Sequence, residues 1–147
     1  FPELKRHYID TGKMRYISRD FPLESHEYGL EAAQATRCAG EQGKYWEMKD
    51  ILMTNYERLT PDLIFSLAQQ AEIDMSIFEA CMDGEKYIPE IKNEISAART
   101  VGITGTPTFV LGKVMGEYLD GYKLVGNQPF QAFDSLAKGI LAEENIR

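Results

Sequence analysis

Between about Ser25 and Thr100, apolar residues recur at the spacing of α-helix faces with few interruptions. The flanking segments follow another pattern. Lys13 to Phe21 favours a strand, because Met14 and Tyr16 alternate with charged residues. Thr108–Leu111 and Tyr122–Val125 are two further short strand candidates. A helical block of roughly 75 residues set between strands predicts an α/β protein with a large helical insertion.

Local signals predict where helices of the block begin and end. Thr60 followed by Pro61 is an N-cap with proline at the first helical position, and Asp74 caps the next helix. Gly84 ends that second helix, whereas Gly40 and Gly43 interrupt an earlier one.

Two further helices are predicted outside the block. Phe1, Leu4 and Tyr8 share one helical face that stops near Gly12, which is typical of the back half of a helix. Pro129 opens the last helix of the chain.

Composition excludes several classes of function. The net charge of −7 without a basic run argues against nucleic acid as a partner. Apolar runs are no longer than three residues, so we expect no membrane span. Cys38, Cys81, His7 and His26 lie too far apart for ordinary zinc spacing, and no phosphate-loop pattern occurs, so we expect neither a metal nor a cofactor.

The strongest local signal for a binding site is the Gly105-Thr106-Pro107-Thr108 segment. Proline donates no hydrogen bond to a strand ladder and therefore belongs at a strand start. A tight turn can lock an X-Pro bond in the cis form, which would leave the backbone of Thr106 open to an extended peptide. A trans proline that merely begins the strand is the alternative, and it is the commoner case.

The segments RDFPL, CAGEQGKYWEMKDILM and GITGTPTFVLG resemble the DsbA family of thiol–disulfide oxidoreductases, most specifically in GEQGKYW and GTPTFVL. The resemblance covers nearly the whole chain. It implies a thioredoxin-like core, residues 1–24 and 101–147, split by a helical domain, residues 25–100. It also implies that Thr106 and Pro107 form a cis-proline loop that binds the substrate backbone.

The chain departs from that family in its cysteines. The family's first strand and CxxC motif would precede Phe1, so we expect the 147-residue chain itself to be inactive and the parent protein to form or exchange disulfides. Cys38 and Cys81 do not replace the motif, because neither begins a predicted helix. Two alternatives stay open: a glutathione-dependent enzyme of the kappa-class transferase or chromene-carboxylate isomerase type, and a non-catalytic peptide-binding module.

The resemblance also bears on the two cysteines and on partners. Cys38 and Cys81 are either buried free thiols or one structural disulfide, and the periplasmic or other extracytoplasmic location of these bacterial proteins permits the bridge that we expect. Expected partners are unfolded or reduced polypeptides and a redox partner protein. Loss of the first strand would leave strand edges unpaired, so we also expect direct pairing of its neighbours or a homodimer formed through open edges or segment exchange.

The remaining candidates have ordinary structural explanations. Arg19 and Asp20 are predicted to form an ion pair at a strand end. His7 and His26 are expected at the surface, and Trp46 beside Tyr45 is expected to pack in the core of the helical domain.

Overall fold

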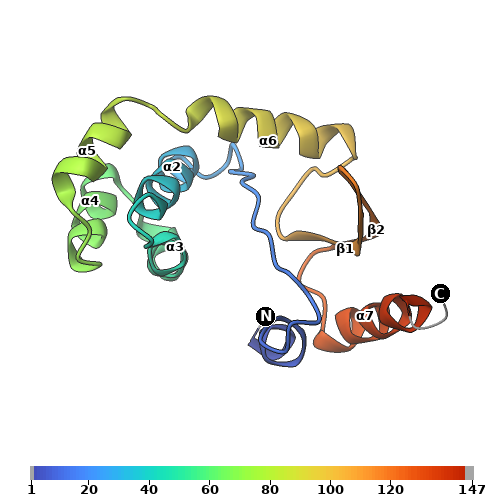
Figure 1. The fold of residues 1–147 in the computed structure, drawn as a ribbon. Helices are drawn as coiled ribbons and strands as arrows, with labels where there is room; N and C mark the ends of the chain where they lie inside the picture. Colours follow the sequence, from blue (N-terminus) through green and yellow to red (C-terminus); the bar gives the residue numbers. More distant parts are fainter. Residues whose placement is uncertain (1, 145–147) are drawn as a thin grey trace. The chain divides into compact units, whose positions relative to one another are not determined.

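The computed structural model describes residues 2–144, which form two compact units (Figure 1). The helical unit comprises Arg19–Gly102 and contains the whole expected insertion. The core unit comprises the chain up to Ser18 and the chain from Ile103 onward. Each unit is described by itself below.

The helical unit contains all the helices predicted in the block. Its elements are α2 (Gly29–Gly40), α3 (Tyr45–Thr54), the short 3-10 turn η2 (Tyr56–Arg58), α4 (Pro61–Gln70), α5 (Met75–Asp83) and α6 (Ile88–Thr100). The predicted caps are present. Thr60 Oγ1 accepts a hydrogen bond from the Leu63 N–H at 3.2 Å, and Asp74 Oδ1 accepts one from the Ser76 N–H at 3.0 Å. These bonds satisfy backbone donors that a helix leaves free in its first turn.

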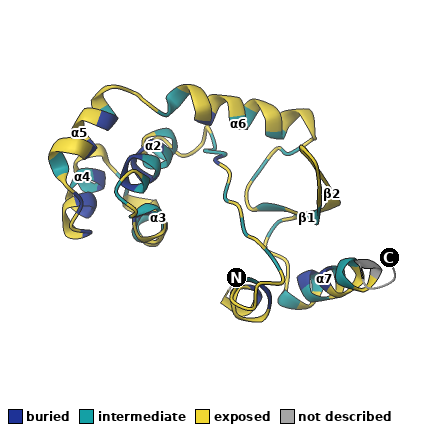
Figure 2. Cartoon of the chain, viewed as in Figure 1, coloured by how far each residue is buried: buried dark blue, intermediate teal, exposed yellow. Residues whose placement is uncertain are grey.

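The inner faces of α2 to α5 form one hydrophobic core (Figure 2). Its buried members are Ala35, Cys38, Ala39, Met48, Leu52, Ile64, Leu67, Ala68, Ala71, Ile73, Phe78 and Cys81. The small residues Ala35 and Ala39 of α2 and the large Phe78 of α5 are all fully buried in this core. The sequence periodicity therefore marks the buried faces correctly.

The core unit joins the two ends of the chain. It consists of α1 (Pro2–Leu4), the π-helical turn η1 (Lys5–Ile9), the strands β1 (Thr108–Met115) and β2 (Tyr118–Val125), and α7 (Phe130–Glu144). Leu4 and Tyr8 pack with Phe133 and Ala137 of α7. Phe109 of β1 meets Phe133 edge to face, with ring centroids 5.0 Å apart. One face of the hairpin is thereby attached to α7.

β1 and β2 form an antiparallel hairpin, and both strands extend beyond the predicted ranges. The sequence analysis placed the end of the first strand at Leu111 because Gly112 follows it. In the structure Gly112 lies inside the ladder opposite Gly121. A Cβ atom on Gly112 would lie 2.0 Å from the Asp120 carbonyl oxygen, so this crossing requires glycine. The turn is made by Gly116, at a φ of +64°, and Glu117.

The predicted strand at Lys13–Phe21 is wrong. These residues run without regular secondary structure from η1 toward α2 (Figure 1). A lone strand leaves its backbone donors and acceptors unpaired, and among residues 2–144 the sheet consists of β1 and β2 only. Alternating charged and apolar residues therefore did not suffice for a strand here.

Candidate functional site

The Thr106–Pro107 loop leads directly into β1, and both residues are exposed. The peptide bond between them is cis. Two hydrogen bonds hold the loop: Gly126 N–H donates to the Pro107 carbonyl oxygen at 2.8 Å, and Thr108 Oγ1 donates to the Gly105 carbonyl oxygen at 2.7 Å. The loop is thus attached both to the end of β2 and to the start of β1.

The outer edge of β1 has no strand neighbour within the described residues. An edge of this kind presents backbone N–H and C=O groups to which an extended peptide can bind. Thr106 lies two residues before Thr108, the first residue of β1, and Pro107 stands between them. The loop and the edge together form the peptide-binding candidate of this chain.

Cys38 of α2 and Cys81 of α5 form a disulfide, with Cα atoms 5.8 Å apart. Both residues are buried. Because their sulfurs are bonded to each other, the alternative of two free thiols does not apply. Each cysteine is the third residue from the C-terminal end of its helix. A helix C-terminus carries partial negative charge, which disfavours a thiolate. This pair is therefore placed as a structural bridge and not as a reactive dithiol.

Two charged side chains lie beside that bridge. Glu41 Oε1 is 3.5 Å from Cys81 Sγ and 2.8 Å from Lys86 Nζ. Hydrogen bonds from Lys86 and Tyr87 lower the pKa of Glu41, so its carboxylate stays ionised at neutral pH. The sequence analysis did not single out either charged residue. Their positions shortly after Cys38 and Cys81, at the ends of two predicted helices, were the available signal.

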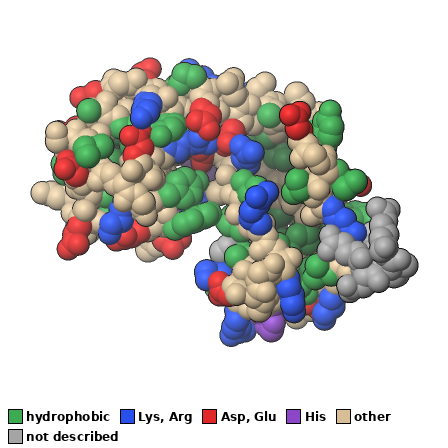
Figure 3. Space-filling view, viewed as in Figure 1, with side chains coloured by type: hydrophobic (Ala, Val, Ile, Leu, Met, Phe, Trp, Pro, Cys, Tyr) green, Lys and Arg blue, Asp and Glu red, His purple; other side chains and the backbone are tan. Residues whose placement is uncertain are grey.

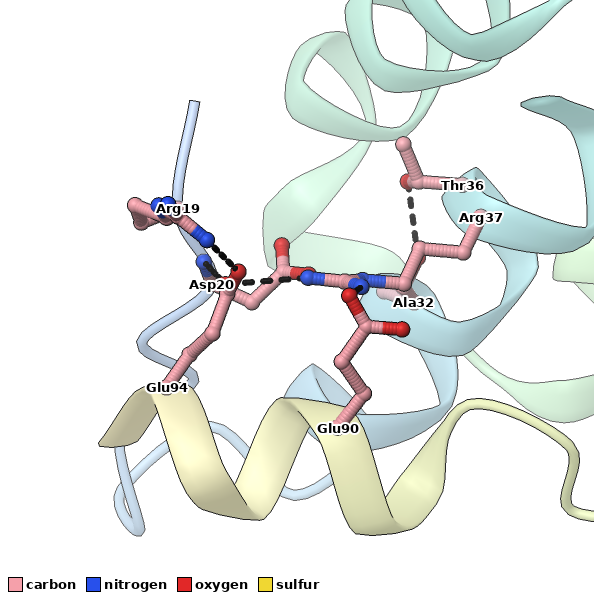
Figure 4. A network of polar contacts seen from close by, with 7 residues as sticks. All are labelled: Arg19, Asp20, Ala32, Thr36, Arg37, Glu90 and Glu94. Atoms are coloured by element: carbon pink, nitrogen blue, oxygen red, sulfur yellow. Dashed lines mark hydrogen bonds and ion pairs between the residues drawn. The ribbon is translucent and has the colours of Figure 1, made fainter. Parts of the chain in front are cut away.

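Arg19 and Asp20 belong to a wider ion-pair network in the helical unit (Figure 4). Arg37 Nε binds Asp20 Oδ2 at 2.5 Å, and Arg37 Nη2 binds Glu94 Oε2 at 2.9 Å. Glu94 also accepts from Arg19 Nη1 at 2.7 Å and from the Asp20 N–H at 2.6 Å. A further contact joins Arg37 to Glu90 at 2.6 Å. Arg19 and Asp20 therefore do form ion pairs, with Glu94 of α6 and Arg37 of α2. The expected place at a strand end is wrong, because no strand forms there.

The network fixes the charges of its members. Burial alone would raise the pKa of Glu94, but hydrogen bonds from the Asp20 N–H, Arg19 and Arg37 bring it below the ordinary value. Burial likewise opposes the charge of Arg37, but the surrounding carboxylates raise its pKa. The arrangement attaches the segment before α2 to α2 and α6. It therefore has a structural role.

The other candidates stay at the surface. His7 is exposed in η1, with its ring centroid 5.4 Å from that of Phe130, and His26 is exposed before α2. Trp46 is 49% exposed, so the prediction that it packs in the core is wrong. Its ring contacts Tyr45 edge to face at 4.9 Å. The signal that was missed is the helical phase, because Met48 and Leu52 define the buried face of α3.

No group of three potential metal ligands occurs among the described residues. The helical unit has sixteen acidic and eight basic residues, and acidic side chains are spread over the face drawn in Figure 3. A dispersed charge of this kind does not define a site. Within residues 2–144, the helices are too short or too polar to cross a membrane.

Comparisons with known proteins agree with the fold. A family model described as thioredoxin matches residues 1–127. The crystal structure of alpha-DsbA1 from Wolbachia pipientis is similar, with a TM-score of 0.83 and 26% identity. That match covers 99% of this chain and 77% of the Wolbachia chain. The expected thioredoxin-like fold with inserted helices is therefore confirmed.

Two relatives illustrate the range of proteins that contain a similar segment. A Rickettsia conorii protein, provisionally named protein-disulfide oxidoreductase, is 29% identical over 125 residues. The Na(+)/H(+) antiporter NhaA 3 of Salinispora tropica is 26% identical over 147 residues. The chain spans 44% of the first protein and 21% of the second. Both relatives are thus more than twice as long as the matching segment.

Proposed function

Because this chain belongs to the DsbA family of thioredoxin-fold proteins, we propose that it is part of a thiol–disulfide oxidoreductase that forms or exchanges disulfides in other polypeptides. The observation that carries the proposal is the exposed Thr106–Pro107 loop, which leads directly into β1. In the proposed reaction, the backbone of Thr106 holds the backbone of a reduced substrate polypeptide by strand-like hydrogen bonds.

The proposal assigns the chemical step to cysteines outside residues 1–147. Both cysteines of this chain are buried in one disulfide, and exchange needs an accessible thiolate with a resolving partner nearby. The chain contributes substrate binding and the helical unit. It does not contribute the nucleophile.

The proposed location is the periplasm or another extracytoplasmic compartment of a bacterium. Support comes from the Cys38–Cys81 disulfide, because such bridges persist in oxidising compartments. The proposed partners are reduced polypeptides and a protein that restores the redox state of the catalytic cysteines. A second copy of the chain, pairing along the open edge of β1, is a further proposed partner.

Substitutions in the loop test the binding role. In the full-length protein, Thr106→Arg places a long charged side chain at the proposed peptide edge and should raise KM for a reduced peptide substrate severalfold. Thr104→Arg is the matched control, since Thr104 is also exposed and two residues earlier in the same loop. Unchanged KM in a correctly folded Thr106→Arg variant would exclude this edge as the binding site.

A non-catalytic peptide-binding module is the second candidate function. It is favoured by the absence of any accessible thiol among the described residues. The match to a protein named as an antiporter, over 99% of this chain, also supports a module joined to other machinery. Trapping of a mixed disulfide between the full-length protein and a reduced substrate separates the candidates, because only the oxidoreductase forms one.

A further inference from the structure

Among the contacts of the described residues, one charged group lies against a sulfur of the Cys38–Cys81 bridge. It is the carboxylate of Glu41, and the sulfur is that of Cys81. Glu41 Oε1 lies 3.5 Å from Cys81 Sγ. A disulfide sulfur carries no proton and donates nothing to that oxygen. The contact therefore places a carboxylate against a sulfur without the hydrogen bond that a thiol would provide.

The local fold delivers this carboxylate. Glu41 follows the last residue of α2, where its N–H bonds back to the Ala39 and Cys38 carbonyl oxygens. Lys86 follows the end of α5, and its N–H lies 3.4 Å from the Cys81 carbonyl oxygen. Each cysteine is thus followed, within one helical turn or slightly more, by one member of the Glu41–Lys86 ion pair.

Glu41 Oε1 is shared between two neighbours of different kinds. Lys86 Nζ binds it at 2.8 Å and partly neutralises it, whereas Cys81 Sγ offers no compensating positive charge. The Glu41 side chain is 25% exposed and the Lys86 side chain 56% exposed, so solvent reaches this corner of the bridge. Cys38 is fully buried, and Cys81 is 6% exposed.

We propose that Glu41 is a specificity-determining residue that protects the Cys38–Cys81 disulfide from anionic thiols while leaving it more open to neutral and cationic ones. The proposal concerns the redox chemistry of this bridge and does not depend on the activity proposed above. The chemical class of reactant is a small monothiol, and the property that Glu41 selects is its charge.

The reaction has two balanced steps. A thiolate attacks one protein sulfur, the bridge breaks, a mixed disulfide forms, and the second protein sulfur leaves as a thiolate that takes a proton from water. A second thiolate then attacks the mixed disulfide and releases the oxidised dimer of the small thiol. Two small thiols are oxidised in total, and the bridge is reduced to two protein thiols.

Glu41 opposes both possible first steps. If the attack is on Cys81, the incoming thiolate approaches a sulfur that already contacts a carboxylate, and the two negative charges repel. If the attack is on Cys38, Cys81 leaves as a thiolate beside the same carboxylate and becomes a poorer leaving group. Only the first effect depends on the charge of the small thiol.

The test measures how fast the bridge is reduced in the full-length protein. Cys38 and Cys81 are followed individually by differential alkylation and mass spectrometry. The reductants are thioglycolate, 2-mercaptoethanol and cysteamine, which are anionic, neutral and cationic, with rates compared per thiolate. Glu41→Gln should accelerate reduction by thioglycolate roughly fivefold, as expected for removal of a neighbouring unit charge, and should accelerate reduction by cysteamine least.

Lys86→Met provides the opposite change. Removing the cation exposes the full charge of Glu41, so reduction by thioglycolate should become slower. Simple loosening of the helix ends would instead make reduction of the bridge faster with all three thiols and in both variants. Glu79→Gln, an exposed residue of α5, is the matched control and should leave all three rates unchanged.

The outcomes separate the explanations. Opposite effects of the two variants, graded by the charge of the reductant, support the proposal. Equal acceleration by all three thiols, or no change in Glu41→Gln, overturns it. If Glu41→Gln does not fold, Lys86→Met decides alone, since faster reduction by thioglycolate in that variant contradicts the proposal.

Discussion

The Tyr8 hydroxyl donates a 2.6 Å hydrogen bond to Asp134 Oδ1, which links the N-terminal helical turn to α7 across 126 positions of sequence. Tyr8 is buried against α7, and Lys138 binds the second carboxylate oxygen of Asp134 at 2.7 Å. This contact joins the two sequence segments of the core unit.

Tyr8→Phe should lower the free energy of unfolding by about 1 kcal/mol, the usual contribution of one such hydrogen bond. The wild-type contribution should also depend on pH. Burial and the bond to Asp134 raise the pKa of Tyr8 from 10.0 to about 12. The hydroxyl therefore stabilises the fold fully below pH 10, and this stabilisation is lost as the pH rises toward 12.

Urea unfolding of both proteins at several pH values measures the effect. The difference between wild type and Tyr8→Phe should shrink as the pH increases from 10 to 12. A difference that stays constant over this range would contradict the assignment.

Arg37→Met should destabilise the helical unit by about 3–5 kcal/mol, because it removes the cation that binds the buried Asp20 carboxylate and the largely buried Glu94 carboxylate. Arg99→Met is the control. Arg99 pairs with Glu24 at 3.1 Å, and both side chains are largely exposed, so its loss should cost less than about 1 kcal/mol. Denaturant unfolding measures the free energy of unfolding of both variants. An equal decrease in the two would show that the Arg37 network stabilises the fold no more than an exposed ion pair does.

The same network should make stability depend on pH in the acid range. Its hydrogen bonds hold the pKa of Glu94 below the ordinary value of 4.5, despite its burial. The carboxylate therefore stabilises the fold above that value, and the contribution is lost as the pH falls through the lowered pKa. Glu94→Gln should make the free energy of unfolding depend less on pH in this acid range. An unchanged pH dependence in the variant would refute the assignment.

Cys38→Ala combined with Cys81→Ala should cost about 4 kcal/mol by the chain-entropy relation for a loop of this length. The bridge spans 43 positions between α2 and α5. Thermal unfolding of the wild type under reducing conditions should approach the result for the double variant. A loss below about 1 kcal/mol would indicate that the bridge contributes little to stability.

Gly112→Ala should disrupt the β1–β2 hairpin, because the added Cβ would meet the Asp120 carbonyl oxygen of the facing strand. Gly139→Ala is the control. Its Cβ meets nothing within 4 Å on the exposed face of α7, and alanine should stabilise that helix by about 0.5–1 kcal/mol. Amide hydrogen exchange of the hairpin distinguishes the variants, and equal protection in both would contradict the account.

The sequence predicted the helical unit well because its determinants are local. The side chains of Thr60 and Asp74 cap helices by accepting hydrogen bonds from backbone N–H groups two or three residues later. α2 ends at Gly40, where the sequence indicates an interruption. Strand prediction was less accurate because strands depend on partners. Lys13–Phe21 has a strand-like pattern but no neighbour to pair with among the described residues, whereas Gly112 resembles a strand end and continues the ladder opposite Gly121.

The candidate site shows the same division. Thr106 and Pro107 were proposed because proline has a distinctive position at a strand start, and their binding role stays a prediction. Glu41 and Lys86 were not found, since their relation to the bridge depends on how α2 and α5 pack. Arg37 of α2 likewise binds partners from two distant segments, Asp20 before α2 and glutamates of α6, and no sequence spacing indicates that meeting.

The most direct test of the central claim is a thiol–disulfide exchange assay, in which insulin is reduced by a dithiol in the presence of the protein. The account predicts that the full-length protein retains its activity when Cys38 and Cys81 are both replaced by alanine. It also predicts that the 147-residue chain shows no activity above background. Turnover by the 147-residue chain that disappears on Cys38→Ser or Cys81→Ser would contradict it, because the buried bridge would then be the reactive pair.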